Sequence, residues 1–156
     1  MQIANSVHIA RAEWRWTTLV GIFLLLLSFL PFLLIALLNT PDANWRFMGA
    51  LHGYQDAAAS LARINQGIDG KLLVHFQHTP DVHTPVLIES IYVLIGQASR
   101  LTGVGPIVWF HLTRMMATLF MYLAFYQLGA TIWVKLRSRR IFFLVVSLGS
   151  GVGWLL

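Results

Sequence analysis

The apolar positions of this chain fall in long continuous runs, and most of its polar positions gather between them. The first run, residues 16–38, has 23 positions without a charge. That is about 35 Å of helix at ~1.5 Å per residue, and a helix needs about 20 apolar residues to cross a bilayer. The pattern therefore predicts a transmembrane helix at 16–38, preceded by a polar leader at 1–15.

Three more apolar runs follow towards the C-terminus. Residues 86–101 predict a second span, although Glu89, Gln97 and Arg100 interrupt it, and residues 107–134 predict a third. Residues 141–156 begin a fourth run of 16 positions, short of the ~20 that a span needs. This run is either a short, tilted helix or the start of a span that continues in a longer protein, and we expect the second.

The long polar loop at 39–84 opens with an amphipathic pattern, which predicts a helix at 45–66. Apolar residues recur there at steps of three or four, namely Phe47, Leu51, Tyr54, Ala58, Leu61 and Ile64. Asp56, Ser60 and Arg63 fall on the polar side, and Gly67 is placed to end the helix. Beside membrane spans, such a helix is expected to lie along the membrane surface with its apolar face in lipid.

Composition supports a membrane protein. The chain is 57% hydrophobic and 11% charged, whereas soluble domains have about 25% charged residues. We therefore expect an all-α integral membrane fold with three to four transmembrane helices and an interfacial helix in the first long loop. The chain has no cysteine, which excludes thiolate chemistry and cysteine-bound metal.

The net charge of +5 comes from short basic clusters at the predicted membrane edges. These clusters favour anionic lipid headgroups as partners, not nucleic acid. Arg11 and Arg15 predict a cytoplasmic N-terminus, but three crossings would then put the more basic cluster at 135–140 outside, against the positive-inside rule. Either residues 86–134 do not cross twice, or the N-terminus is outside.

Arg114 is a charged residue within a predicted span, where a charge normally has a protein partner. If the helices at 86–101 and 107–134 form a hairpin, Glu89 and Arg114 lie at similar depths, which predicts a Glu89–Arg114 ion pair. His111 lies one turn from Arg114 on the same face. The pair is either purely structural, or Arg114 and His111 bind an anionic headgroup or phosphate.

The loop holds the other candidates for chemistry. Asp56, on the polar side of the predicted amphipathic helix, could act as a general base toward an acceptor hydroxyl or help hold a divalent cation. The alternative is a solvated acid that pairs with Arg63 or His52. His52, His75, His78 and His83 are candidate substrate-binding residues. Their spacing fits no zinc motif, so no metal site is assigned.

Three stretches carry a resemblance to a known family: residues 53–67 (GYQDAAASLARINQG), 75–83 (HFQHTPDVH) and 110–114 (FHLTR). Together with the first transmembrane helix at 16–38 and the proline-containing end of the loop, which leads back into the membrane, they resemble the N-terminal part of GT-C-type polytopic membrane glycosyltransferases of bacteria. These enzymes use polyprenyl-phosphate-linked sugars. The resemblance implies an inner-membrane location and makes Asp56 the first-loop base or metal ligand. It also implies that Arg114 and the loop histidines serve the donor phosphate. Gln55 stands where many such enzymes have a second acid.

Two hypotheses of different classes follow. In the first, the chain is the N-terminal portion of a glycosyltransferase that transfers a sugar from a polyprenyl-phosphate donor to an acceptor at the membrane face. In the second, it is a small non-enzymatic polytopic protein. That protein would assemble with partner helices through the close approach that Gly149 and Gly153 allow.

Overall fold

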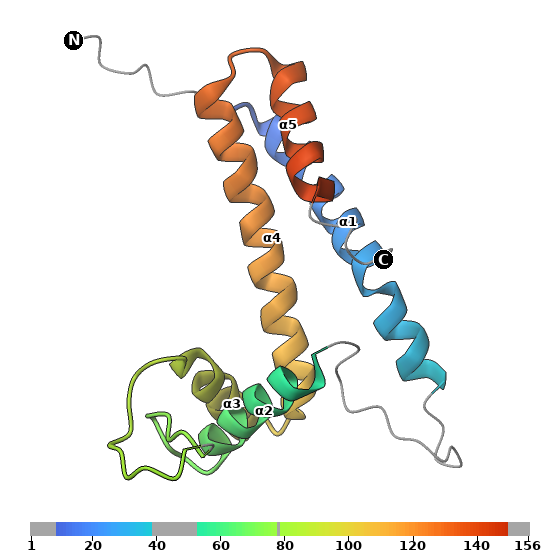
Figure 1. The fold of residues 1–156 in the computed structure, drawn as a ribbon. Helices are drawn as coiled ribbons and strands as arrows, with labels where there is room; N and C mark the ends of the chain where they lie inside the picture. The colour runs from blue at the N-terminus through green and yellow to red at the C-terminus, as the bar shows by residue number, and fades with distance from the viewer. Residues whose placement is uncertain (1–8, 39–52, 78, 150–156) are drawn as a thin grey trace, which may run out of the picture. The chain divides into compact units, whose positions relative to one another are not determined.

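A computed structural model describes residues 9–38, 53–77 and 79–149, and within them the fold is all-α, as the sequence predicts. Five helices follow in order: α1 (Arg11–Leu38), α2 (Tyr54–Ile68), α3 (Ser90–Thr102), α4 (Pro106–Ile132) and α5 (Leu136–Gly149) (Figure 1). The extended backbone pairs at a single isolated bridge among the described residues, between Val74 and Val86.

Two of these helices, α1 with 28 residues and α4 with 27, are long and apolar enough to cross a membrane. The predicted span at 86–101 is not among them. The helix there, α3, has 13 residues, about 20 Å at the helical rise, which is too short for a bilayer. It begins late because Val86 is held in extended backbone by Val74 and because Glu89 has a left-handed φ of 59°. Among the described residues, two helices thus have the length and composition of a span, where three to four were expected, while α5 runs to the last described residue.

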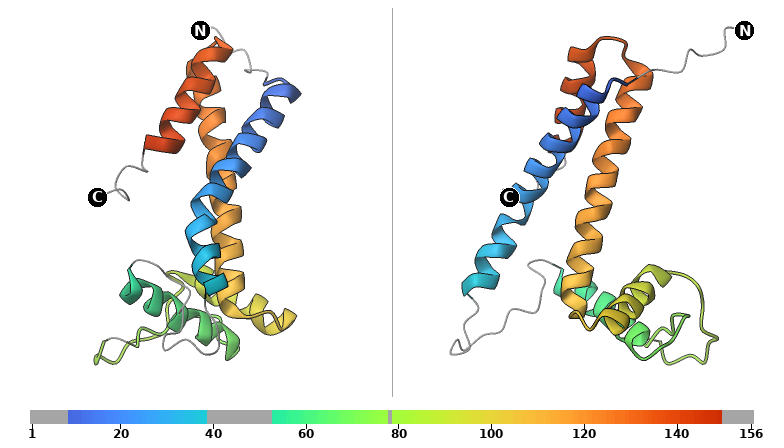
Figure 2. Two further views of the ribbon diagram at one scale, coloured as in Figure 1. Left: turned by 90° about the vertical axis from the view of Figure 1, so that its right-hand side faces the viewer. Right: turned by 180° about the vertical axis from the view of Figure 1, so that it is seen from behind.

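The chain forms two compact units. The first contains residues 1–30 and 115–156, so that it holds the N-terminal part of α1, the C-terminal part of α4, and α5. Its core is Tyr122, Tyr126 and Phe143, and the Phe143 ring meets each of the two tyrosine rings edge to face, with centroids 6.0 Å apart. Gly21 of α1 faces Tyr122, and α5 turns back beside the C-terminal part of α4 (Figure 2).

The second unit contains residues 31–114, and α2 and α3 lie side by side in it. The two helices cross at Gly67 and Gly96. A Cβ on Gly67 would lie 2.9 Å from the Gly96 Cα and would overlap the Val93 carbonyl. Gly67 therefore does not end α2, as its position in the sequence suggested. The helix continues to Ile68, and Gly67 instead allows the two backbones to touch.

The apolar face of α2 packs on protein at this crossing. Ile64 is fully buried, and its carbonyl lies against Gly96. The expected burial of this face in lipid is thus replaced, at Ile64, by contact with α3. The part of the predicted helix that precedes Gly53 lies outside the described residues.

The connection between α2 and α3 folds back along α2. The buried side-chain amide of Gln66 donates to the His75 carbonyl and accepts from the His75 N–H, both at 2.8 Å. Nine residues after Val74, the chain has reversed direction, so that His83 accepts a hydrogen bond from the Phe76 N–H. Gln66 thus replaces a neighbouring strand as the partner of this extended segment.

Candidate functional site

Asp56 lies in the first turn of α2, and it is exposed. Gly53, just before the helix, has a left-handed φ of 62°, which suits glycine and sets the direction in which α2 starts. Seven residues separate Asp56 from Arg63, which is close to two helical turns. The two side chains therefore share one face of α2, about 10 Å apart along its axis.

Arg63 is the centre of the contacts between α2 and the connection that leads from α2 to α3. Its Nε lies 2.8 Å from the Glu89 Oε2, and its guanidinium lies 5.9 Å from the centroids of the Phe76 and Tyr92 rings. The Arg63 side chain is 17% exposed and that of Glu89 43%. A cation between aromatic rings and a carboxylate gains from both. Arg63 therefore joins α2, the loop and the start of α3.

The predicted Glu89–Arg114 ion pair is wrong, because Glu89 pairs with Arg63 instead. The reason lies in the backbone. Glu89 precedes α3 in a left-handed conformation, and α3 packs against α2. Its carboxylate is accordingly directed to α2, and the register of an assumed helical hairpin does not apply.

A shallow hollow opens beside Arg63 on α2. It is lined by Ala59, Ala62, Arg63, Gln66, His75, Phe76 and Gln77. The small side chains of the two alanines leave space on the α2 side of the hollow. On the opposite side, Gln66 holds the backbone of His75 through two hydrogen bonds. Asp56 lies on the same face of α2, towards the N-terminus of the helix.

His75 and His83, two of the candidate substrate-binding residues, lie together. Their rings stack with centroids 4.4 Å apart and an interplanar angle of 10°. His83 Nε2 accepts from the Phe76 N–H at 2.9 Å, and its Nδ1 lies 3.0 Å from the Asp81 carbonyl. These partners require the tautomer with the proton on Nδ1. His83 thus holds the loop closed, and the exposed His75 ring faces solvent beside the hollow.

The remaining predicted residues are placed as follows. His111 and Arg114 lie on α4, where the His111 ring meets Phe32 edge-on at 4.9 Å. The exposed Arg114 has its guanidinium 5.6 Å from the centroids of the Phe32 and Phe110 rings. His52 and His78 are outside the described residues. Within the described part of the chain, no three His or acidic side chains are grouped to hold a metal ion.

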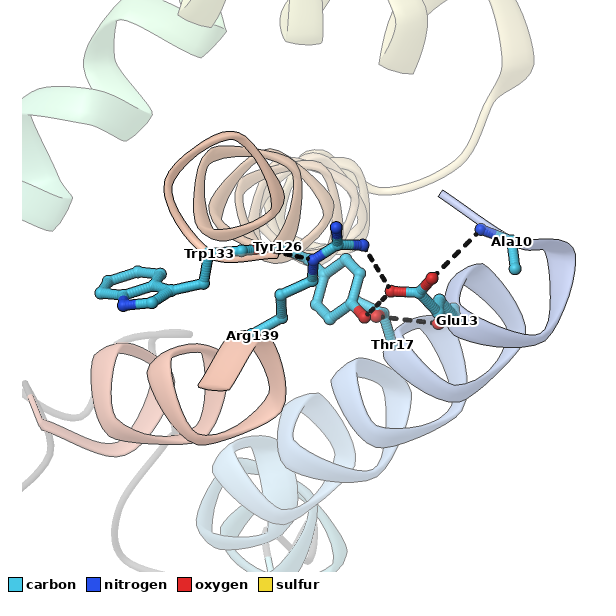
Figure 3. Close-up of polar contacts among 6 residues, drawn as sticks. All are labelled: Ala10, Glu13, Thr17, Tyr126, Trp133 and Arg139. Carbon is cyan, nitrogen blue, oxygen red and sulfur yellow. Dashed lines mark hydrogen bonds and ion pairs between the residues drawn. The ribbon is translucent and has the colours of Figure 1, made fainter. Parts of the chain in front are cut away.

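The sequence reasoning missed a polar cluster in the first unit (Figure 3). Glu13 Oε2 accepts from the Tyr126 hydroxyl at 2.6 Å and from Arg139 Nη1 at 3.0 Å, and Glu13 Oε1 accepts from the Ala10 N–H at 3.2 Å. Arg139 Nε also donates to the Trp133 carbonyl at 2.7 Å. Side chains of Glu13 and Arg139 are 12% and 9% exposed, so this is a buried pair that joins α1, α4 and α5. One signal was available, since Glu13 is the sole acid in the first 38 residues.

Gly149 is exposed at the end of α5, with open space around it, and Gly153 lies outside the described residues. The helix–helix partner expected at these two glycines stays a prediction.

Comparisons with known proteins gave no relative for this chain: no protein-family model, no curated protein and no solved structure matches it.

Proposed function

We propose that this chain is part of an integral membrane glycosyltransferase in which α1 and α4 cross the bilayer. The support for membrane insertion is the exposed apolar surface of α1. Its side chains are more than half exposed at many positions along the helix, among them Leu19, Phe23, Leu26, Leu33, Leu37 and Leu38. Contiguous apolar surface of this extent is rare on soluble proteins and is typical of a lipid-facing helix.

Two crossings also remove the conflict between the basic clusters. With an even number of spans, the clusters at 11–15 and 135–140 lie on the same side of the membrane, and both satisfy the positive-inside rule. Residues 39–105 then lie between the two crossings and face the opposite, extracytoplasmic side. The α2–α3 pair belongs to that segment.

The single observation that carries the function is the exposed Asp56 on the face of α2 that also forms the hollow beside Arg63. The helix is fixed by Gly67 against α3 and by Gln66 against the loop, so its carboxylate is presented from a rigid element. A positioned carboxylate is what a transfer to a hydroxyl acceptor requires, and Arg63, Gln66 and His75 supply polar groups at the hollow beside it.

In the proposed reaction, Asp56 removes the proton of an acceptor hydroxyl. The hydroxyl oxygen forms a bond to the anomeric carbon of the donor sugar. The bond from that carbon to the phosphate oxygen breaks, and polyprenyl phosphate leaves with its electron pair. The exposed Arg114 guanidinium and His75 are the groups proposed to meet the phosphate charge. A divalent cation held by Asp56 is the other way in which the same carboxylate could serve this reaction.

The test is a transfer assay with the full chain in proteoliposomes, a radiolabelled polyprenyl-phosphate hexose as donor and a hydroxyl acceptor panel. We predict that Asp56→Asn lowers transfer at least 100-fold, within the range of about 10²–10⁴ that general-base catalysis supplies. The fold should persist, because Asp56 is exposed. Helical circular dichroism of the variant checks this.

Asp69→Asn is the matched control. Asp69 is an exposed acid of the same unit that follows the last residue of α2, at the opposite end of the helix from Asp56, and it is not among the residues that line the hollow. It should retain full transfer. Equal rates for Asp56→Asn and the unmodified chain, or an equal loss in both variants, would contradict the assignment of Asp56.

A further inference from the structure

The charge of this chain is concentrated at one place. Six of its eleven lysines and arginines lie in residues 11–15 and 135–140, with one of its six acids. The rest of the chain contains five basic and five acidic residues and is neutral. The entire formal charge of +5 therefore belongs to two short segments that are more than 110 residues apart in sequence.

The fold joins these two segments into one surface. Glu13 at the start of α1 contacts Tyr126 of α4 and Arg139 of α5. Because the one acid of the region is buried against Arg139, it does not neutralise the others. Four basic side chains stay exposed around it, namely Arg11, Arg15, Lys135 and Arg137. We call these four residues the basic rim.

The basic rim borders directly on apolar surface. Leu19 on α1, Ile132 on α4 and Ile141 on α5 are 65%, 58% and 51% exposed. Tryptophan lies between the two zones: the Arg140 guanidinium lies 4.8 Å from the centroid of the Trp16 ring. Tryptophan and arginine in this order are typical of the level of the lipid headgroups. A soluble anion or a nucleic acid would use the charge and leave the adjoining apolar side chains in water.

We propose that the basic rim binds the phosphates of anionic phospholipids. Phosphodiester headgroups supply the opposite charge, and their acyl chains cover the neighbouring apolar faces of α1, α4 and α5. Arginine suits this role because its planar guanidinium donates two parallel hydrogen bonds to phosphate oxygens. The buried Glu13–Arg139 pair sets the spacing of the rim, since it fixes the start of α5 against α1. This proposal does not depend on any catalytic role of Asp56.

The test is lipid retention by the full chain, measured by native mass spectrometry after exchange into detergent with equimolar phosphatidylglycerol and phosphatidylcholine. The unmodified chain should retain phosphatidylglycerol preferentially. Lys135→Gln with Arg137→Gln should lower its apparent affinity for phosphatidylglycerol about 30-fold, which follows from ~1 kcal/mol per basic residue. Binding of phosphatidylcholine should not change.

Lys71→Gln with Arg100→Gln is the matched control, because it removes two exposed positive charges from the other unit. It should leave the preference for phosphatidylglycerol intact. No preference in the unmodified chain, or an equal loss in both double variants, would overturn the proposal. Thermal unfolding of both variants in neutral detergent should match that of the unmodified chain, and a lower midpoint for the rim variant alone would also overturn it.

Discussion

At the scale of single residues, the sequence identifies which charges need partners but does not choose between partners. Glu89 has a predicted place near Arg114, yet it pairs with Arg63. The choice depends on one backbone angle, the left-handed φ of Glu89, and on the packing of α3 against α2. Residue types predict neither the backbone angle nor the packing, because a glutamate with positive φ is uncommon.

A double-mutant cycle tests this assignment. We predict that Arg63→Gln and Glu89→Gln are coupled by about 0.5–1 kcal/mol in the free energy of unfolding, a modest value because Glu89 is 43% exposed and solvent screens the pair. Glu89→Gln and Arg114→Gln should instead be additive. Unfolding in mixed micelles, followed by circular dichroism, gives the free energy of unfolding of each single and double variant. Coupling of Glu89 to Arg114 and none to Arg63 would restore the pair that the sequence suggested.

At the scale of elements, periodicity predicts that helices exist but not what covers their faces. The steps of three and four at 45–66 predict a helix, and α2 occupies Tyr54–Ile68, whereas the part of the prediction before Gly53 lies outside the described residues. The same pattern is compatible with lipid or protein on the apolar face. Gly67 and Gly96 decide in favour of protein, because they let α2 and α3 approach backbone to backbone. Gly96 lies 29 residues after Gly67, and no sequence pattern predicts that the two are in contact.

The crossing can be tested by adding a single methyl group. We predict that Gly67→Ala or Gly96→Ala lowers the stability of the α2–α3 unit by about 1–3 kcal/mol or more. Helix propensity favours alanine by only about 1 kcal/mol, and here the obstacle is backbone that no rotamer change can move. Hydrogen exchange of the α2 amides is the appropriate measurement.

Gly105→Ala is the control for both variants, since a Cβ there meets nothing within 4 Å. Its exchange rates should equal those of the unmodified chain. Unchanged protection in Gly67→Ala would show that α2 and α3 do not cross at these glycines.

At the scale of the whole molecule, hydropathy predicts well the two helices that are long and apolar enough to cross a membrane, but it overcounts the others. α1 and α4 agree with the runs at 16–38 and 107–134, because uninterrupted apolar length is visible in sequence. α3 was mistaken for a span because its apolar residues serve a contact with α2, and residue composition does not distinguish the two uses. In the proposed topology, α1 and α4 are the two crossings, so that the segment with Asp56 lies on one side of the membrane and the basic clusters lie on the other.

The most direct test of this account is the sidedness of two single cysteines, which the chain permits because it contains no other. Val82, in the loop before α3, and Val134, between α4 and α5, are 105% and 92% exposed and tolerate replacement by cysteine. A membrane-impermeant maleimide applied to right-side-out and inside-out vesicles should label Val82→Cys only from the extracytoplasmic side and Val134→Cys only from the cytoplasmic side. Labelling of both cysteines from the same side would contradict the two crossings, and with them the separation of the Asp56 site from the basic rim.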